Sequence, residues 1–199
     1  MTWLNDSDAL PEKRVSAIDH PHRFVTVVSY ELPIGQGRML NPHARWANML
    51  AGGWSLQNVY TYQTGAPLAF VNGSSNAPGD YIYLGGPLNL HNRQVDGSTF
   101  DVTRFDTAAA DALNYHIRTF PTAFSSLRAD GINQWDVSLL KRLDITEKLH
   151  FQLRAEAFNA INHPVFAGPN TTASNRQFGQ ITATANRFRT LQLGARIAF

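Results

Sequence analysis

Five segments of the sequence alternate between apolar and polar residues with a period of two, which is the pattern of a β-strand. They lie near residues 22–32, 53–64, 133–143, 149–161 and 188–199. The last segment illustrates the pattern, since Leu191, Leu193 and Ile197 alternate with Gln192 and Arg196. All 10 prolines fall outside the five segments, as pairing in the interior of a sheet requires. The sequence therefore predicts an all-β chain.

The length of these segments favours a membrane barrel over a soluble sheet, although a half-exposed soluble sheet also alternates. Each runs about 10 to 12 residues, which suffices to cross a hydrocarbon core as a tilted strand, whereas soluble strands commonly have about 5 or 6. Aromatic residues sit toward the ends of the apolar faces, and charged residues occupy the opposite faces. We expect a partial antiparallel transmembrane β-barrel of about five long meander strands with long outer loops.

Shorter and longer connections alternate between the predicted strands, as periplasmic turns and outer loops do in such barrels. The longest is an outer loop over residues 65–132, and the C-terminus is expected on the periplasmic side. Residues 71–80 and 85–90 are rich in Gly, Pro, Asn and Ser and predict irregular loop. Residues 105–115 could form a short helix inside this loop. Residues 1–21 form a lead-in or the remainder of a loop.

Composition narrows the possible functions. The net charge of +2 is not gathered into basic runs, so no nucleic-acid partner is expected. With no cysteine there are no disulfides or thiolate ligands. No apolar run approaches the roughly 18 residues of a transmembrane helix, and the first ten residues do not resemble a signal peptide. Five strands are too few for a closed single-chain barrel, so the chain is expected to be a piece of a larger one.

Residues 126–166, SLRADGINQWDVSLLKRLDITEKLHFQLRAEAFNAINHPVF, resemble the closing hairpin of TonB-dependent outer-membrane receptors of the Oar-like kind. The shared features are an Asn-x-Trp-Asp-x-Ser-Leu strand and a return strand that ends in Phe-Asn-x-x-Asn-His-Pro. Upstream, DHPHRFVTVVSYELPIGQG from Asp19 and LAGGWSLQNVYTYQTGAPL from Leu50 resemble the preceding hairpin of the same family.

This resemblance implies the C-terminal barrel segment of a receptor in the cell outer membrane, with barrel wall and outer loops that serve ligand uptake. Its expected partners are outer-membrane lipid, an upstream barrel and plug region, the barrel-assembly machinery and, only through the full-length receptor, the TonB system. The family's plug domain has no counterpart here, so transport by the chain alone is not expected.

Two sets of candidate site residues follow. Apolar residues at alternate positions up to the terminal aromatic are similar to the C-terminal assembly signal of outer-membrane proteins: Leu191, Leu193, Ala195, Ile197 and Phe199. Asp136, Arg154 and Glu156 are candidates for the lumen face, with a plain ion pair favoured over substrate contact for the last two. Asp136 is expected to hydrogen-bond across the barrel wall.

No catalytic constellation, cofactor site or metal site is predicted, so the chain is not expected to be an enzyme. His20 and His22 would make an incomplete ligand set for a metal. The sequence contains no nucleophile elbow, phosphate loop or His-Glu-x-x-His motif, which makes a small hydrolase improbable. A soluble all-β carbohydrate- or ligand-binding module stays open, with an aromatic platform of Trp54, Tyr60, Tyr62 and Trp135.

Overall fold

The structure is a computed structural model that describes residues 3–35, 37–70, 81–90, 97–108, 110–113 and 117–199. The chain forms two compact units. The first contains Met1–Pro21, Thr64–Gly131 and Val165–Ala185, and the second contains His22–Gln63, Ile132–Pro164 and Asn186–Phe199. No helix among the described residues is long and apolar enough to cross a membrane.

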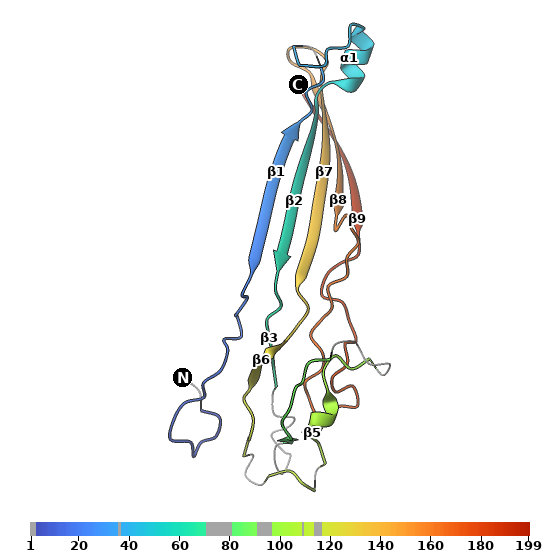
Figure 1. The fold of residues 1–199 in the computed structure, drawn as a ribbon. Helices are drawn as coiled ribbons and strands as arrows, with labels where there is room; N and C mark the ends of the chain where they lie inside the picture. Colours follow the sequence, from blue (N-terminus) through green and yellow to red (C-terminus); the bar gives the residue numbers. More distant parts are fainter. Residues whose placement is uncertain (1–2, 36, 71–80, 91–96, 109, 114–116) are drawn as a thin grey trace. The chain divides into compact units, whose positions relative to one another are not determined.

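The second unit is an antiparallel sheet whose strand order β1-β2-β7-β8-β9 follows the sequence (Figure 1). Its strands are β1 (Arg23–Glu31), β2 (Trp54–Gln63), β7 (Ile132–Asp144), β8 (His150–Phe158) and β9 (Thr190–Ala198). The prediction of an all-β chain with five long meander strands is thus confirmed. The sheet is open, since β1 and β9 each pair with one described strand.

The connections of this sheet are of unequal kinds. The short helix α1 (Arg45–Ala51) lies between β1 and β2, and a tight turn joins β7 to β8. β8 ends at Phe158 rather than near residue 161, because Asn159 and Asn162 have positive φ angles of 51° and 52°. Asparagine tolerates this left-handed conformation better than most residues, and it does not continue a strand.

The first unit is built around aromatic side chains. Two short strand pairs frame it: β3 (Pro67–Ala69) with β6 (Ala123–Arg128), and β4 (Ile82–Tyr83) with β5 (Phe105–Asp106), which directly follows the 3₁₀ helix η1 (Val102–Arg104). The buried core consists of Leu68, Phe70, Tyr81, Leu88, Phe100, Phe105, Phe120 and Leu127. The ring of Phe70 lies 5.3 Å from that of Phe105 and 5.5 Å from that of Phe100, between centroids. The long loop is therefore a folded unit with its own core.

The helix predicted from Phe105 is wrong over the residues that the structure describes, where Phe105 and Asp106 form β5. Two local contacts oppose a helix. The Phe105 side chain is drawn into the aromatic core, and the Asp106 carboxylate accepts a hydrogen bond of 3.0 Å from the Ala108 N–H, a turn contact that competes with helix formation. The predicted irregular loop at 71–80 lies outside the described residues.

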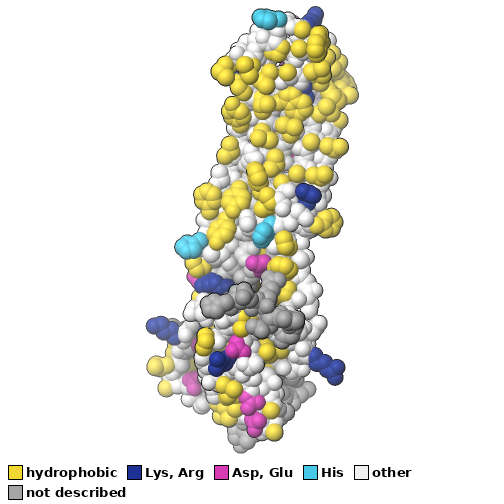
Figure 2. Space-filling model, turned by 45° about the vertical axis from the view of Figure 1, so that its right-hand side comes forward, with side chains coloured by type: hydrophobic (Ala, Val, Ile, Leu, Met, Phe, Trp, Pro, Cys, Tyr) yellow, Lys and Arg dark blue, Asp and Glu magenta, His cyan; other side chains and the backbone are white. Residues whose placement is uncertain are grey.

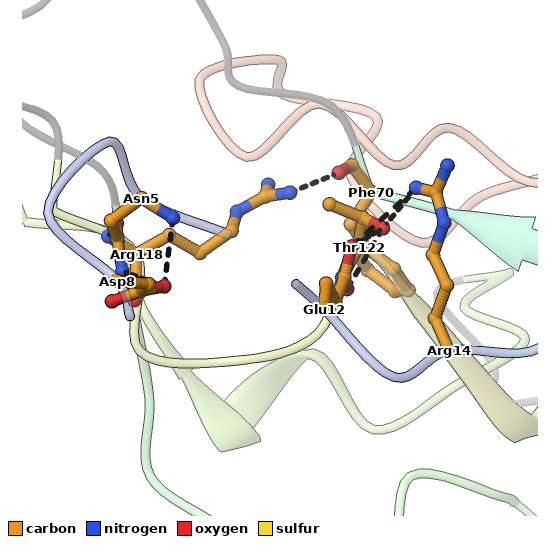
Figure 3. A network of polar contacts seen from close by, with 7 residues as sticks. All are labelled: Asn5, Asp8, Glu12, Arg14, Phe70, Arg118 and Thr122. Atoms are coloured by element: carbon orange, nitrogen blue, oxygen red, sulfur yellow. Dashed lines mark hydrogen bonds and ion pairs between the residues drawn. The ribbon is translucent and has the colours of Figure 1, made fainter. Parts of the chain in front are cut away.

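Residues 3–21 belong to this loop unit and are held to it by polar contacts (Figure 3). The Asn5 side chain pairs with the backbone of Arg118, donating to its carbonyl at 3.0 Å and accepting from its N–H at 2.6 Å. Glu12 accepts hydrogen bonds from the N–H and hydroxyl of Thr122 at 2.6 and 3.0 Å. The start of the chain thus packs with the long loop.

Candidate functional site: the two faces of the sheet

The strand register sorts the side chains of the five strands into two faces, because residues directly opposite each other in an antiparallel pair point the same way. One continuous row across the sheet consists of Tyr30, Leu56, Leu139, Ala155 and Leu193. Every member is apolar or aromatic. We call the face that carries this row the apolar face.

The neighbouring row, one residue along each strand, is polar throughout. It consists of Ser29, Gln57, Ser138, Glu156 and Gln192, and it lies on the opposite face, which we call the polar face. The change from an apolar row to a polar row occurs in all five strands. Such a sheet suits a wall with an apolar medium on one side and water on the other.

The apolar face carries large side chains that are exposed, above all on β9. Leu191 is 72% exposed, Leu193 83% and Ile197 61%. On the side drawn in Figure 2, hydrophobic side chains gather over the strands with few charged ones among them. Exposed apolar area of this extent is unusual for a protein in water and indicates a contact surface.

Aromatic side chains mark both ends of the apolar face. Tyr60 is directly opposite Trp135 near one end, and the ring of Phe24 lies 6.4 Å from that of Tyr60. Near the other end, Trp54 begins β2, and Phe151 is directly opposite Ile197 at the second residue pair between β8 and β9. Two belts of this kind are typical of strands that cross a bilayer.

Charged groups on the polar face have polar partners. Glu156 accepts a hydrogen bond of 3.0 Å from the Ser138 hydroxyl and lies 3.7 Å from the Arg154 guanidinium. Asp136 accepts hydrogen bonds of 3.0 Å from the Gln134 amide and 2.9 Å from the Asn159 N–H. All three residues predicted for the lumen side therefore share this face.

Asn159 links the end of β8 to the start of β9. Its side chain is almost fully buried, and its amide group donates to the carbonyl oxygens of His163 and Arg187, both at 3.1 Å. Its amide oxygen accepts from the His163 N–H at 3.0 Å. With the Asp136 contact to its backbone, this residue fixes three segments at one end of the sheet.

A cavity of about 500 Å³ lies on the polar face at the end where β1 ends and β2 begins. Its wall carries ion pairs of both signs: Arg38 with Glu31 at 2.7 Å and Arg142 with Asp144 at 3.2 Å. His150 also lies 2.6 Å from Asp144. The described residues hold no group of three or more His, Cys, Asp and Glu side chains that could bind a metal.

Comparison with known protein families agrees with this geometry. The family described as outer membrane beta barrel domain matches residues 1–192. The chain belongs to this outer-membrane β-barrel family. No curated protein and no solved structure matches it in the corresponding comparisons. Membership in this family places the protein in the outer membrane, as the sequence predicted. This location is inconsistent with the alternative of a soluble binding module.

In this outer-membrane barrel domain, the residues of the predicted assembly signal lie on or directly after β9. Leu191, Leu193, Ala195 and Ile197 share the apolar face of β9, and Phe199 follows that strand fully exposed. His20 belongs to the loop unit, and its Nδ1 lies 2.7 Å from the carbonyl oxygen of Thr64 in the same unit.

Sequence reasoning missed two features, Asn159 as a link and the cavity on the polar face. A signal for the first was present in the Phe-Asn-x-x-Asn-His-Pro stretch, because asparagine at a strand end often marks a left-handed backbone. The sequence held no signal for the cavity, since the residues that line it come from four strands, β1, β2, β7 and β8, and from the connection between β1 and β2.

Proposed function

We propose that the five strands form part of the wall of a TonB-dependent outer-membrane receptor of the Oar-like kind. In this proposal the apolar face contacts lipid, the polar face lines the lumen, and the long loop unit lies on the outer side, where it takes part in ligand uptake. The observation that carries it is the pair of adjacent rows, one wholly apolar and one wholly polar. The finer assignment is supported by the resemblance of residues 126–166 to such receptors.

The geometry of that stretch gives the resemblance a physical basis. Asp136 lies in the Asn-x-Trp-Asp segment and Asn159 in the Phe-Asn segment, and the two are joined by a hydrogen bond of 2.9 Å. The two parts of the motif therefore depend on each other. Of the assembly-signal residues, Leu193 and Ile197 would each contact the assembly machinery while the strand is inserted and lipid in the folded barrel.

The open sheet requires further strands before it can work as a wall. The N–H and C=O groups on the outer edges of β1 and β9 have no partner strand among the described residues, and such edges are not tolerated in hydrocarbon. We expect these edges to pair with upstream strands of the same receptor. The chain alone is then not competent for transport, and TonB acts on it only through the complete receptor. We also propose that it has no catalytic activity.

The experiment compares the chain expressed alone with the chain co-expressed with the upstream barrel and plug region of an Oar-like receptor. Size-exclusion chromatography with light scattering in detergent should give aggregates or oligomers for the chain alone and a defined complex after co-expression. A monodisperse monomer that supports ligand uptake without a partner would refute the proposal. Uptake by the complex that persists in cells without TonB would refute the TonB-dependent assignment and leave the barrel wall intact.

A further inference from the structure

The connection between β1 and β2 carries an exposed apolar stripe that the wall function does not use. Trp46, Met49 and Leu50 lie on α1 at positions i, i+3 and i+4, so they share one side of the helix. They are 68%, 58% and 62% exposed. A helix of this kind in water would turn such residues inward, onto a protein core.

Lys141 fixes this helix to the apolar face of the sheet. It lies on β7 directly opposite Trp54 and Leu153, in the same face as Leu139, yet its side chain is only 4% exposed. Its ammonium group donates to the carbonyl oxygens of Met49 at 2.7 Å and Leu50 at 3.0 Å, and also to that of Gly52.

These contacts account for all three donors of the lysine and for carbonyl groups at the helix end that have no partner within the helix. The ammonium also lies 5.3 Å from the centre of the Trp54 ring, a favourable cation–π distance. Gly53 completes the close approach: its φ is +69°, and a Cβ there would collide with the Arg142 carbonyl oxygen. The helix is thus held against the side of the sheet that bears the apolar rows.

The charged residues of the connection between β1 and β2 indicate its environment. Residues 33–53 contain Arg38, His43 and Arg45 and no Asp or Glu. Arg38 pairs with Glu31 of the sheet, whereas Arg45 and His43 are exposed beside the apolar stripe. Exposed cations next to exposed Trp and Leu are typical of helices that lie in the headgroup region of a bilayer with their apolar side toward the acyl chains.

We propose that α1 is a phospholipid-binding anchor at the end of the sheet where the turn between β7 and β8 also lies. Trp46, Met49 and Leu50 enter the boundary between headgroups and acyl chains, and Arg45 contacts lipid phosphate. Lys141 is the positioning residue that holds the helix at this depth. The anchor continues the apolar face of a protein that resides in the outer membrane. Lipid binding by α1 does not depend on whether the receptor is coupled to TonB.

The absence of cysteine from the chain permits a clean test. Met49→Cys is labelled with an environment-sensitive fluorophore, and Glu147→Cys, in the exposed turn between β7 and β8 at the same end of the sheet, is the matched control. The full chain, together with a cysteine-free upstream barrel region that pairs with its open edges, is folded into vesicles of phosphatidylcholine and phosphatidylglycerol that carry a quencher at the headgroup or at the acyl-chain end. Only samples with a strand-type circular dichroism spectrum are compared.

The label at position 49 should be quenched by the headgroup quencher at least about twofold more than the label at position 147, and more than by the acyl-end quencher. Leu50→Cys should behave alike if Met49→Cys folds poorly. Lys141→Met should reduce the difference in headgroup quenching between positions 49 and 147 while the circular dichroism spectrum is unchanged. Arg45→Gln should make the quenching at position 49 independent of phosphatidylglycerol. Equal quenching at both positions, or stronger quenching from the acyl end, would overturn the proposal.

Discussion

An arginine at Leu193 tests the assignment of the two faces directly. Leu193 is one residue from the centre of β9, is 83% exposed, and continues the row of Ala155 and Leu139. If this row meets lipid, Leu193→Arg places a guanidinium close to the bilayer midplane, which costs about 2–4 kcal/mol. Since about 1.4 kcal/mol is tenfold in an equilibrium constant, folding in lipid should weaken by a factor of roughly 30 to 1,000.

The matched control is Gln192→Arg, one residue away on the polar face. Gln192 is directly opposite Glu156, so the new guanidinium would gain an acidic neighbour, worth about 0.2–1 kcal/mol, and would stay in water. We expect this variant to be neutral or slightly more stable. Leu193→Ala separates the loss of apolar area from the cost of the charge, and it should cost less than Leu193→Arg.

The assay is reversible urea unfolding in vesicles of one lipid composition, with the free energy of unfolding extrapolated to zero urea. All variants are co-expressed with the same upstream barrel region, so that the outer edge of β9 has the same neighbour in each. Equal effects of arginine at positions 192 and 193 would refute the assignment of faces. A larger cost at 192 would reverse it.

Four further outcomes are expected. Asn159→Ala should lower the free energy of unfolding of the sheet by about 1–3 kcal/mol in the same urea assay, because buried backbone partners lose their hydrogen bonds. Phe70→Ala should cost the loop unit about 3–5 kcal/mol, seen as faster proteolysis of that unit while the sheet stays protected. The Thr103 hydroxyl lowers the pKa of Asp101, so their contact should stabilise η1 above about pH 4 and be lost as the pH falls below that; Asp101→Asn should abolish this dependence in hydrogen exchange at Thr103. Phe199→Ala should reduce the amount of protein assembled in the outer membrane of cells, whereas an unchanged amount would exclude it from the assembly signal.

The sequence by itself determined the strands and their faces. In β9, for example, the alternation of Leu191 and Leu193 with Gln192 is a local property, because successive side chains of a strand point to opposite sides whatever lies beyond. The same period in five segments predicted an all-β membrane sheet, and short turns such as the one between Asp144 and His150 left sequential pairing as the simplest order.

Only the tertiary structure decided which distant residues meet. Phe70, Phe105 and Phe120 share a core although long stretches of chain separate them, and no period relates their positions. Lys141 has the parity of a lipid-facing residue, and its burial depends on carbonyl groups of Met49 and Leu50, nearly a hundred residues away in the chain. Such contacts are not encoded in local spacing, because they arise from the register between strands and from the path of the connections, both of which are set by packing of the whole chain.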